Sequence, residues 1–208
     1  MLLDLGLIDF EECYRLQREL VRKRRAGEIE DSALLAEHNE VFTIGRTGSD
    51  DNLLVGTETL LADGLKVLRI DRGGDVTFHG PGQLMVYPVI DLKRSCMDLH
   101  QYLRGLEELA IRFLKDYSVE AQRVPEKTGV WVRGRKIASV GVGASGWVTY
   151  HGLSININCD LRYFSMINPC GMKDVRMTSL EMIKGAPLEM SGVRKNVANH
   201  LRDIFRLN

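Results

Sequence analysis

Residues 72–84 read RGGDVTFHGPGQL, and five of these thirteen positions are glycine or proline. The apolar runs LKVLRID (65–71) and QLMVYPVIDL (83–92) flank the stretch, and their composition predicts two strands around a glycine-rich loop. Glycine lets the backbone come close to a ligand at a position where a Cβ would block it. The stretch therefore predicts a ligand site between two buried strands.

The composition narrows the class of protein. With 208 residues, 44% of them hydrophobic, the chain suits one globular domain over residues 1–208. Basic and acidic residues balance at 28 each, so the overall charge does not favour a nucleic-acid binder. No apolar run approaches the ~20 residues that span a bilayer. Asp4 and Asp9 stand where a signal peptide would be basic, so we expect a cytoplasmic protein.

Hydrophobic periodicity predicts a mixed α/β fold of the α+β class. Helices are expected from Asp9, with Glu12 in a capping box, to Gly27, and again over 98–117, 178–185 and 193–205. Strands are expected over 40–46, 65–71, 83–92, 119–124, 129–134, 135–144 and 147–158. The segment after Asp160 reads as irregular. Strands dominate the middle of the chain and helices flank them.

Two motifs have a purely structural interpretation as well as a functional one. GVGASG (141–146) matches G-x-G-x-x-G, but the dinucleotide-binding version needs a helix after the glycines, and WVTYHGLSININ reads as a strand. A glycine turn in a hairpin is therefore favoured. RKRR (22–25) ends a helix, where cations favour the dipole, and reads as a solvated face; its functional interpretation is a docking patch for an acidic partner.

The histidines and cysteines do not show metal-ligand spacing. No H-x-x-x-H or C-x-x-C pattern occurs, so we expect no metal site and four reduced thiols. Cys13 and Cys159 read as core residues. His79 differs from the other histidines because it lies inside the glycine-rich stretch, although a structural role is also open to it.

Cys170 is the candidate nucleophile. Pro169 and Gly171 place it on a tight turn, where a thiol can be presented to a pocket, and the alternative is a purely structural turn. A thiolate needs a nearby cation to be populated at neutral pH. Lys136 opens an apolar strand and is either an exposed turn lysine or such a cation. The residues alone do not choose between these alternatives.

The chain resembles the lipoyl(octanoyl) transferases, the octanoyl-carrier-protein:protein octanoyltransferases. RGGDVTFHGPGQLMVYPVIDL, GRKIASVGV, HGLSININCDL and INPCG occur in the order and spacing of that family, and the resemblance covers residues 40–181. It implies the fold of the lipoate and biotin protein ligase catalytic domain, a mixed sheet flanked by helices with a smaller second sheet.

The resemblance also implies the roles of individual residues. Cys170 would accept the acyl group, and Lys136 would stabilise its thiolate and help move protons. Three walls of the acyl pocket would come from Arg72, Gly73, Gly74, Asp75, Val76, Thr77, Phe78 and His79, from Ser139, Val140 and Gly141, and from Gly152, Leu153 and Ser154. Ser154 departs from the family, which often has Ala there. An apolar pocket with a few polar groups suits an alkyl chain that ends in a carbonyl group.

The implied reaction moves an octanoyl group from octanoyl-acyl carrier protein to a lysine of lipoyl domains through a Cys170 thioester, the first step of endogenous protein lipoylation. The acceptors would be the lipoyl domains of 2-oxoacid dehydrogenase complexes and the glycine cleavage H protein. No cofactor, nucleic acid or membrane is implied. Two alternatives stay open: an ATP-dependent lipoate or biotin protein ligase, and a catalytically silent module that binds lipoylated proteins.

Overall fold

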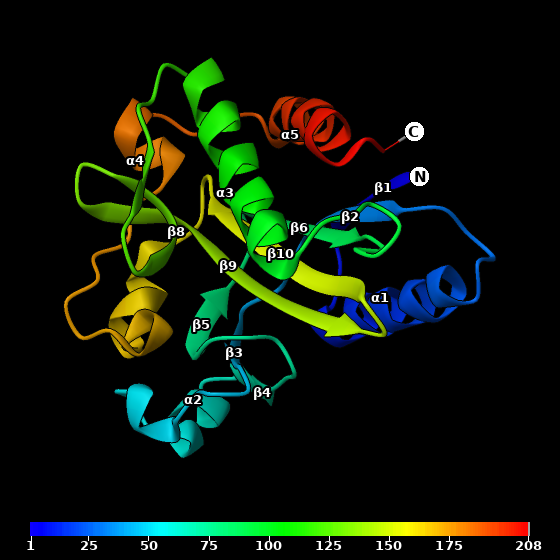
Figure 1. Cartoon of the computed structure of the whole chain (residues 1–208). Helices are drawn as coiled ribbons and strands as arrows, with labels where there is room; N and C mark the ends of the chain where they lie inside the picture. The colour runs from blue at the N-terminus through cyan, green and yellow to red at the C-terminus, as the bar shows by residue number, and fades with distance from the viewer. Residues whose placement is uncertain (208) are drawn as a thin grey trace.

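Two sheets and their flanking helices make up the fold, which a computed structural model describes for residues 1–207 (Figure 1). The large sheet contains β1 (Leu2–Leu7), β2 (Ser32–Glu37), β6 (Gln83–Val89), β7 (Gln122–Val124), β8 (Lys127–Val132), β9 (Arg135–Ser145) and β10 (Val148–Asn156). The small sheet contains β3 (Val41–Ile44), β4 (Lys66–Arg69) and β5 (Val76–His79). The helices are α1 (Phe10–Arg25), α2 (Thr57–Ala62), α3 (Leu99–Asp116), α4 (Leu180–Lys184) and α5 (Met190–Phe205), with 3-10 turns η1 (Asp50–Asn52), η2 (Leu161–Met166) and η3 (Pro169–Gly171).

Both sheets are mixed. The large sheet has the order β1-β2-β6-β10-β9-β8-β7, in which β1 and β2 are parallel and the other neighbours antiparallel. In the small sheet β3 pairs parallel with β4 and antiparallel with β5. The α+β class expected from the sequence, with a large mixed sheet and a smaller second one, is confirmed. Within residues 1–207, no helix is both long and apolar enough to cross a membrane.

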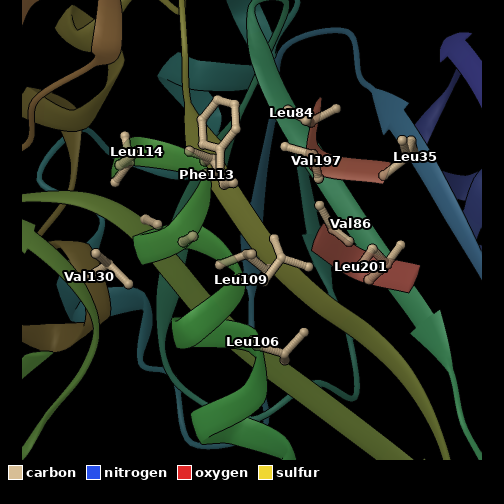
Figure 2. Packing of buried hydrophobic residues seen from close by; sticks show 14 of the residues in the cluster. Leu35, Leu84, Val86, Leu106, Leu109, Phe113, Leu114, Val130, Val197 and Leu201 are labelled. Carbon is tan, nitrogen blue, oxygen red and sulfur yellow. The ribbon is translucent and has the colours of Figure 1, made fainter. Parts of the chain in front are cut away.

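The central strand β6 is buried on both faces, which explains its nearly continuous apolar sequence. Leu84 and Val86 point into one core with α3 and α5, as Figure 2 shows for Leu109 and Val197. Alternate residues of the strand point into a second core under α1. The sheet is therefore held between two helical layers, α3 and α5 on one face and α1 on the other (Figure 1).

Helix α1 begins and ends as its sequence predicts. Asp9 caps it by accepting hydrogen bonds from the backbone N–H groups of Glu11 and Glu12, and Gly27 follows its end with a positive φ of 74°. The RKRR run belongs to the last turn of α1, and its side chains all have partners. Arg22 pairs with Glu28, Lys23 with Glu19, and Arg24 with Asp31, while Arg25 donates to Ser145 Oγ. The four side chains of the run therefore form ion pairs or hydrogen bonds within the molecule.

Four elements were not expected from the sequence: β1, β2, α2 and β5. Strand β2 reads SALLAE and is buried almost throughout, so it has no alternation to mark it as a strand. Helix α2 has six residues, too few for a helical period to show. Strand β5 lies inside the stretch that was expected to be a loop. Its four residues were not recognised as a strand because glycines flank them on both sides. The segment after Asp160, expected to be irregular, contains η2 and η3.

A buried carboxylate, that of Glu107, links α3 to strand β8 of the large sheet. Glu107 on α3 is 1% exposed and accepts a hydrogen bond from the backbone N–H of Gly129 on β8 at 3.0 Å. It also accepts from Arg104 and Arg123. Gly129 has a φ of 118°, and a Cβ there would lie 2.6 Å from Lys136 Cε. Glu107 thus positions the glycine whose missing side chain leaves room for Lys136.

Replacing Glu107 with Ala should lower the free energy of unfolding by about 2–4 kcal/mol, because the Gly129 N–H would stay buried without an acceptor. Urea unfolding monitored by circular dichroism measures this. The matched control is Glu108→Ala, which removes a carboxylate that is 35% exposed and pairs with Arg112 and Arg123. It should cost less than about 1 kcal/mol. Equal losses in the two variants would contradict the role given to Glu107.

Candidate active site

Cys170 and Lys136 meet at the start of strand β9 in the large sheet. Lys136 Nζ lies 3.2 Å from Cys170 Sγ, and the lysine is only 1% exposed. The segment that follows Cys170 is hydrogen-bonded to β9 on both sides of Lys136: Lys136 N–H donates to Arg176 O, and Thr178 N–H donates to Lys136 O. This pairing brings the turn that carries the thiol against the strand that carries the amine.

The turn around Cys170 holds the thiol in an uncommon backbone conformation. Cys170 has φ 58° and ψ 26°, in the left-handed region, inside η3. Pro169 precedes it, and Gly171 follows with a φ of 70°. A Cβ on Gly171 would lie 2.8 Å from Asp75 Oδ2, so the glycine allows the turn to pack against the glycine-rich stretch. Asp75 is itself held by Asn52 Nδ2 at 2.7 Å.

An apolar cavity lies beside Cys170, which is one of its lining residues. Of the residues assigned to its walls by resemblance, those that line it are Arg72, Gly73, Gly74, Asp75, Thr77, His79, Ser139, Val140, Gly141, Gly152, Leu153 and Ser154. Lys136 does not line the cavity, although its Nζ contacts Cys170 Sγ. Val76 and Phe78 do not line it either. They point into the core of the small sheet, because successive side chains of β5 face opposite ways.

Five lining residues were missing from the sequence prediction: Phe10, Ile70, Met85, Tyr87 and His151. Met85 and Tyr87 alternate on β6 with residues of the main core, so the strand pattern shows that they share a face but not that a cavity lies there. His151 immediately precedes the Gly152 wall. Phe10 carries no local signal, because only the packing of α1 against the sheet brings it to the site.

Two glycines of the sheet line the cavity at positions where a Cβ would clash with a neighbouring residue. Gly141 on β9 and Gly152 on β10 are direct partners across the strand pair. A Cβ on Gly152 would lie 2.3 Å from Val86 O, and one on Gly141 would lie 3.0 Å from Arg72 Cδ. GVGASG is therefore part of the β9–β10 hairpin, as the strand after it predicted, and its first glycine accommodates Arg72.

Arg72 brings a positive charge to the cavity wall. It is 8% exposed, and its Nη2 donates to Thr43 O at 2.7 Å and to Thr43 Oγ1 at 2.9 Å. Burial lowers the pKa of Arg72 to about 10, while the neighbouring Cys170 acts in the opposite direction. Its Nε finds no hydrogen-bond acceptor among residues 1–207. A buried donor without a partner is costly, so Arg72 Nε carries an unmet hydrogen bond among these residues.

A buried network of hydrogen bonds runs from Thr43 to the backbone carbonyl of Thr178, which pairs with Lys136 on β9. Gln83 Oε1 can only accept, so His79 Nδ1 donates to it at 2.7 Å and His79 Nε2 accepts from Thr43 Oγ1 at 3.2 Å. Gln83 Nε2 then donates to Asn156 Oδ1, and Asn156 Nδ2 donates to Thr178 O. The chain needs a neutral His79, and burial lowers its pKa to about 3. Arg72 is therefore oriented by a network that ends at Thr178, whose backbone N–H donates to Lys136 O.

Asp71 orients His151 at the far wall of the cavity. His151 has a φ of 55°, and its Nε2 lies 3.1 Å from Asp71 Oδ1. Tyr14 and Tyr150 each donate a hydroxyl hydrogen bond to the same carboxylate at 2.7 Å. The hydrogen bonds from His151 and both tyrosines hold the pKa of Asp71 well below its usual value. No three His, Cys, Asp or Glu side chains within residues 1–207 are arranged to hold a metal ion.

Comparison with known proteins first defines the fold. The bi-partite lipoate protein ligase of Thermoplasma acidophilum superposes with a TM-score of 0.73 at 15% identity, covering 100% of this chain and 84% of that one. Biotin protein ligase from Aquifex aeolicus in complex with biotin and ATP gives 0.59 at 16% identity, covering 99% and 69%. The fold is that of a lipoate and biotin protein ligase catalytic domain.

The sequence comparisons then define the family. The model of the lipoyl protein ligase A/B catalytic domain matches residues 9–202. Octanoyltransferase of Rubrobacter xylanophilus is 49% identical over 202 residues, 96% of this chain and 90% of that protein. Octanoyltransferase of Geobacter metallireducens is 46% identical over 198 residues, 95% and 90% of the two chains. The chain belongs to the lipoyl protein ligase A/B family and, within it, to the octanoyltransferases; it is an acyltransferase enzyme.

Replacing Lys136 with Met should slow alkylation of Cys170 by iodoacetamide at pH 7 by about tenfold or more, and raising the pH to 9 should restore most of the rate. The reason is that a thiol without a cation beside it is only a few per cent thiolate at neutral pH. Mass spectrometry of the Cys170 peptide measures the rate. The control is Arg135→Met, the exposed neighbour on the same strand. Unchanged alkylation in Lys136→Met would remove the ion-pair role.

The buried imidazoles should make stability depend on pH. Burial lowers the pKa of His38 to about 4, against about 6.5 when unfolded, so the unfolded chain binds more protons between these values. Stability is therefore full above pH 6.5 and is lost as the pH falls. From pH 7 to 5, His38 alone should account for about 2 kcal/mol of the loss. His38→Gln should show a loss smaller by that amount in urea titrations at the two pH values, and parallel losses would show the assignment to be wrong.

Proposed function

We propose that this enzyme moves an octanoyl group from octanoyl-acyl carrier protein to a specific lysine of lipoyl domains, through a thioester on Cys170. The observation that carries the proposal is the 3.2 Å contact between a buried lysine and a thiol at the mouth of a glycine-walled apolar cavity. A cation beside a thiol favours the thiolate, which is the nucleophilic form. The cavity offers an apolar slot for the acyl chain that such a nucleophile would accept.

In the first half-reaction the Cys170 thiolate attacks the carbonyl carbon of the donor thioester. The carbonyl electron pair moves to oxygen, and the guanidinium of Arg72, a residue that lines the cavity, supplies positive charge beside it. The bond to the carrier sulfur then breaks, and that sulfur takes a proton from the Lys136 ammonium. One thioester replaces another, so the step is close to isoenergetic.

In the second half-reaction the acceptor lysine attacks the acyl-enzyme. Lys136, now a neutral amine, takes the proton that the incoming amine loses, so it acts as the general base. The bond between the carbonyl carbon and Cys170 Sγ breaks and restores the thiolate beside the Lys136 ammonium. The product is an amide and lies downhill from the thioester. The whole cycle therefore needs no ATP.

Selectivity for the acyl chain follows from burial. Octanoyl has seven carbons beyond its carbonyl, and at ~0.8 kcal/mol per buried methylene the tail supplies about 5 kcal/mol. We further propose lipoyl domains of 2-oxoacid dehydrogenase complexes and the glycine cleavage H protein as acceptors, and the cytoplasm as the compartment. All four cysteines within residues 1–207 are free thiols, which fits a reducing environment.

Cys170→Ala should abolish acyl transfer and leave the fold intact. Incubation with octanoyl-acyl carrier protein followed by intact-mass measurement should show one octanoyl group on the parent protein and none on the variant. The control is Cys96→Ala, which removes an exposed thiol and should keep the adduct. An adduct that persists in Cys170→Ala would move the nucleophile elsewhere.

The same proteins decide between this proposal and the ATP-dependent ligase. A ligase would exchange pyrophosphate into ATP when lipoate or biotin is added, and it would not depend on Cys170. We expect no exchange. Exchange in both the parent and Cys170→Ala would replace the transferase mechanism with adenylation.

A further inference from the structure

Phe10 separates the acyl cavity from a second hollow on the surface. It is the first residue of α1 and 4% exposed, and it lines the cavity that begins at Cys170. It also lines a groove between the start of α1 and the small sheet, where polar residues such as Asp9 and Lys66 lie beside the partly buried Leu65 and Tyr163. Within the described residues it is the one side chain common to both hollows. The ring therefore acts as a partition.

The cavity runs along β5 from Cys170 toward Phe10. At one end Asp75 lies beside the Gly171 turn, since a Cβ there would be 2.8 Å from Asp75 Oδ2. At the other end the ring of Phe10 stacks on His79 with centroids 5.8 Å apart and planes 9° apart. Four residue steps of extended backbone lead from Asp75 to His79, a span of about 13 Å. Phe10 thus stands at the end remote from the thiol.

Interactions on both sides hold the Phe10 ring in place. His38 meets it edge-on at 5.0 Å, in addition to the stack on His79. The preceding residue, Asp9, caps α1 through Oδ1 and accepts from Lys66 Nζ at 2.8 Å through Oδ2. Lys66 belongs to β4, so this pair ties the start of α1 to the small sheet across the groove. The ring is therefore contacted by two imidazoles, and the residue before it is tied to both α1 and β4.

We propose that Phe10 sets the upper limit on acyl chain length by closing the remote end of the cavity, and that without its ring the cavity would continue into the groove. The inference rests on the proposed function, because it assumes that the acyl chain lies in this cavity. A chain longer than the cavity meets the ring and leaves its last methylenes without contacts. Once the ring is removed, those methylenes reach the groove, where Leu65 and Tyr163 offer apolar contacts.

The test compares acyl pantetheine thioesters of 8, 10, 12 and 14 carbons in single-turnover acylation of Cys170, followed by intact mass. In the parent protein the rate should fall at least tenfold between 8 and 12 carbons. In Phe10→Ala the 8- and 12-carbon donors should react at rates within threefold of each other. Phe10→Leu, which removes the ring but keeps an apolar side chain, should lie between them and guards against misfolding of the alanine variant.

Met85→Ala is the matched control. It removes bulk from inside the same cavity but does not line the groove. It should admit the 10-carbon chain and still reject the 14-carbon chain, whereas Phe10→Ala should accept both. A length profile that is the same in Phe10→Ala, Phe10→Leu and the parent would overturn the inference, as would equal opening by Met85→Ala.

A binding measurement separates this inference from the proposed function. Calorimetry with free octanoic and dodecanoic acid needs no thioester chemistry. Tighter dodecanoate binding in folded Phe10→Ala than in the parent, by about tenfold relative to octanoate, supports the partition even if no acyl-enzyme forms. An unchanged ratio of the two affinities overturns it even if the acyl-enzyme forms normally.

Discussion

The contact between Lys136 Nζ and Cys170 Sγ is the interaction on which the site depends. A buried ammonium is costly unless it has a partner, and a thiol is a poor nucleophile until it becomes a thiolate. Each group supplies what the other lacks. In the proposed mechanism the thiolate form of Cys170, whose Sγ lies 3.2 Å from Lys136 Nζ, offsets the cost of burying the ammonium.

Several distant elements cooperate to hold that contact. The backbone pairing of β9 with residues 176–178 fixes the distance from the strand to the cysteine turn. The space for the lysine comes from Gly129, and Glu107 on α3 anchors that glycine. The buried network from Thr43 through His79 to Asn156 extends the same constraint to Arg72. A disturbance on α3 or in the small sheet is therefore expected to reach the thiol.

The cavity owes its shape to missing side chains as much as to those present. Gly141 and Gly152 sit opposite each other, and a Cβ on either would collide with atoms of Arg72 or with the Val86 carbonyl. The same β6 strand that packs α3 and α5 with one face lines the cavity with the other. A sheet buried on both faces can afford a hollow between its layers, because helices on each side keep the remaining surface covered.

The sequence by itself determined the α+β class, the long amphipathic helices and most strands of the large sheet, and it marked Cys170, Lys136 and the glycine walls as candidates for the site. These follow from period, from turn residues and from a long motif, all of which are local in the chain. The roles of those site residues remain predictions. Residues 72–79 could not be sorted from sequence into cavity and core, because the register of β5 decides that Thr77 and His79 face the slot.

Only the tertiary structure decided which distant residues meet there. Phe10, Met85 and Tyr87 reach the cavity because α1 packs on the same face of the sheet that β6 turns toward it. Glu107 reaches Gly129 because α3 crosses the opposite face. Such contacts join residues with no fixed spacing in the chain, so no periodicity records them. The layering of helices on a twisted sheet brings them together, and it is determined by the packing of the whole core.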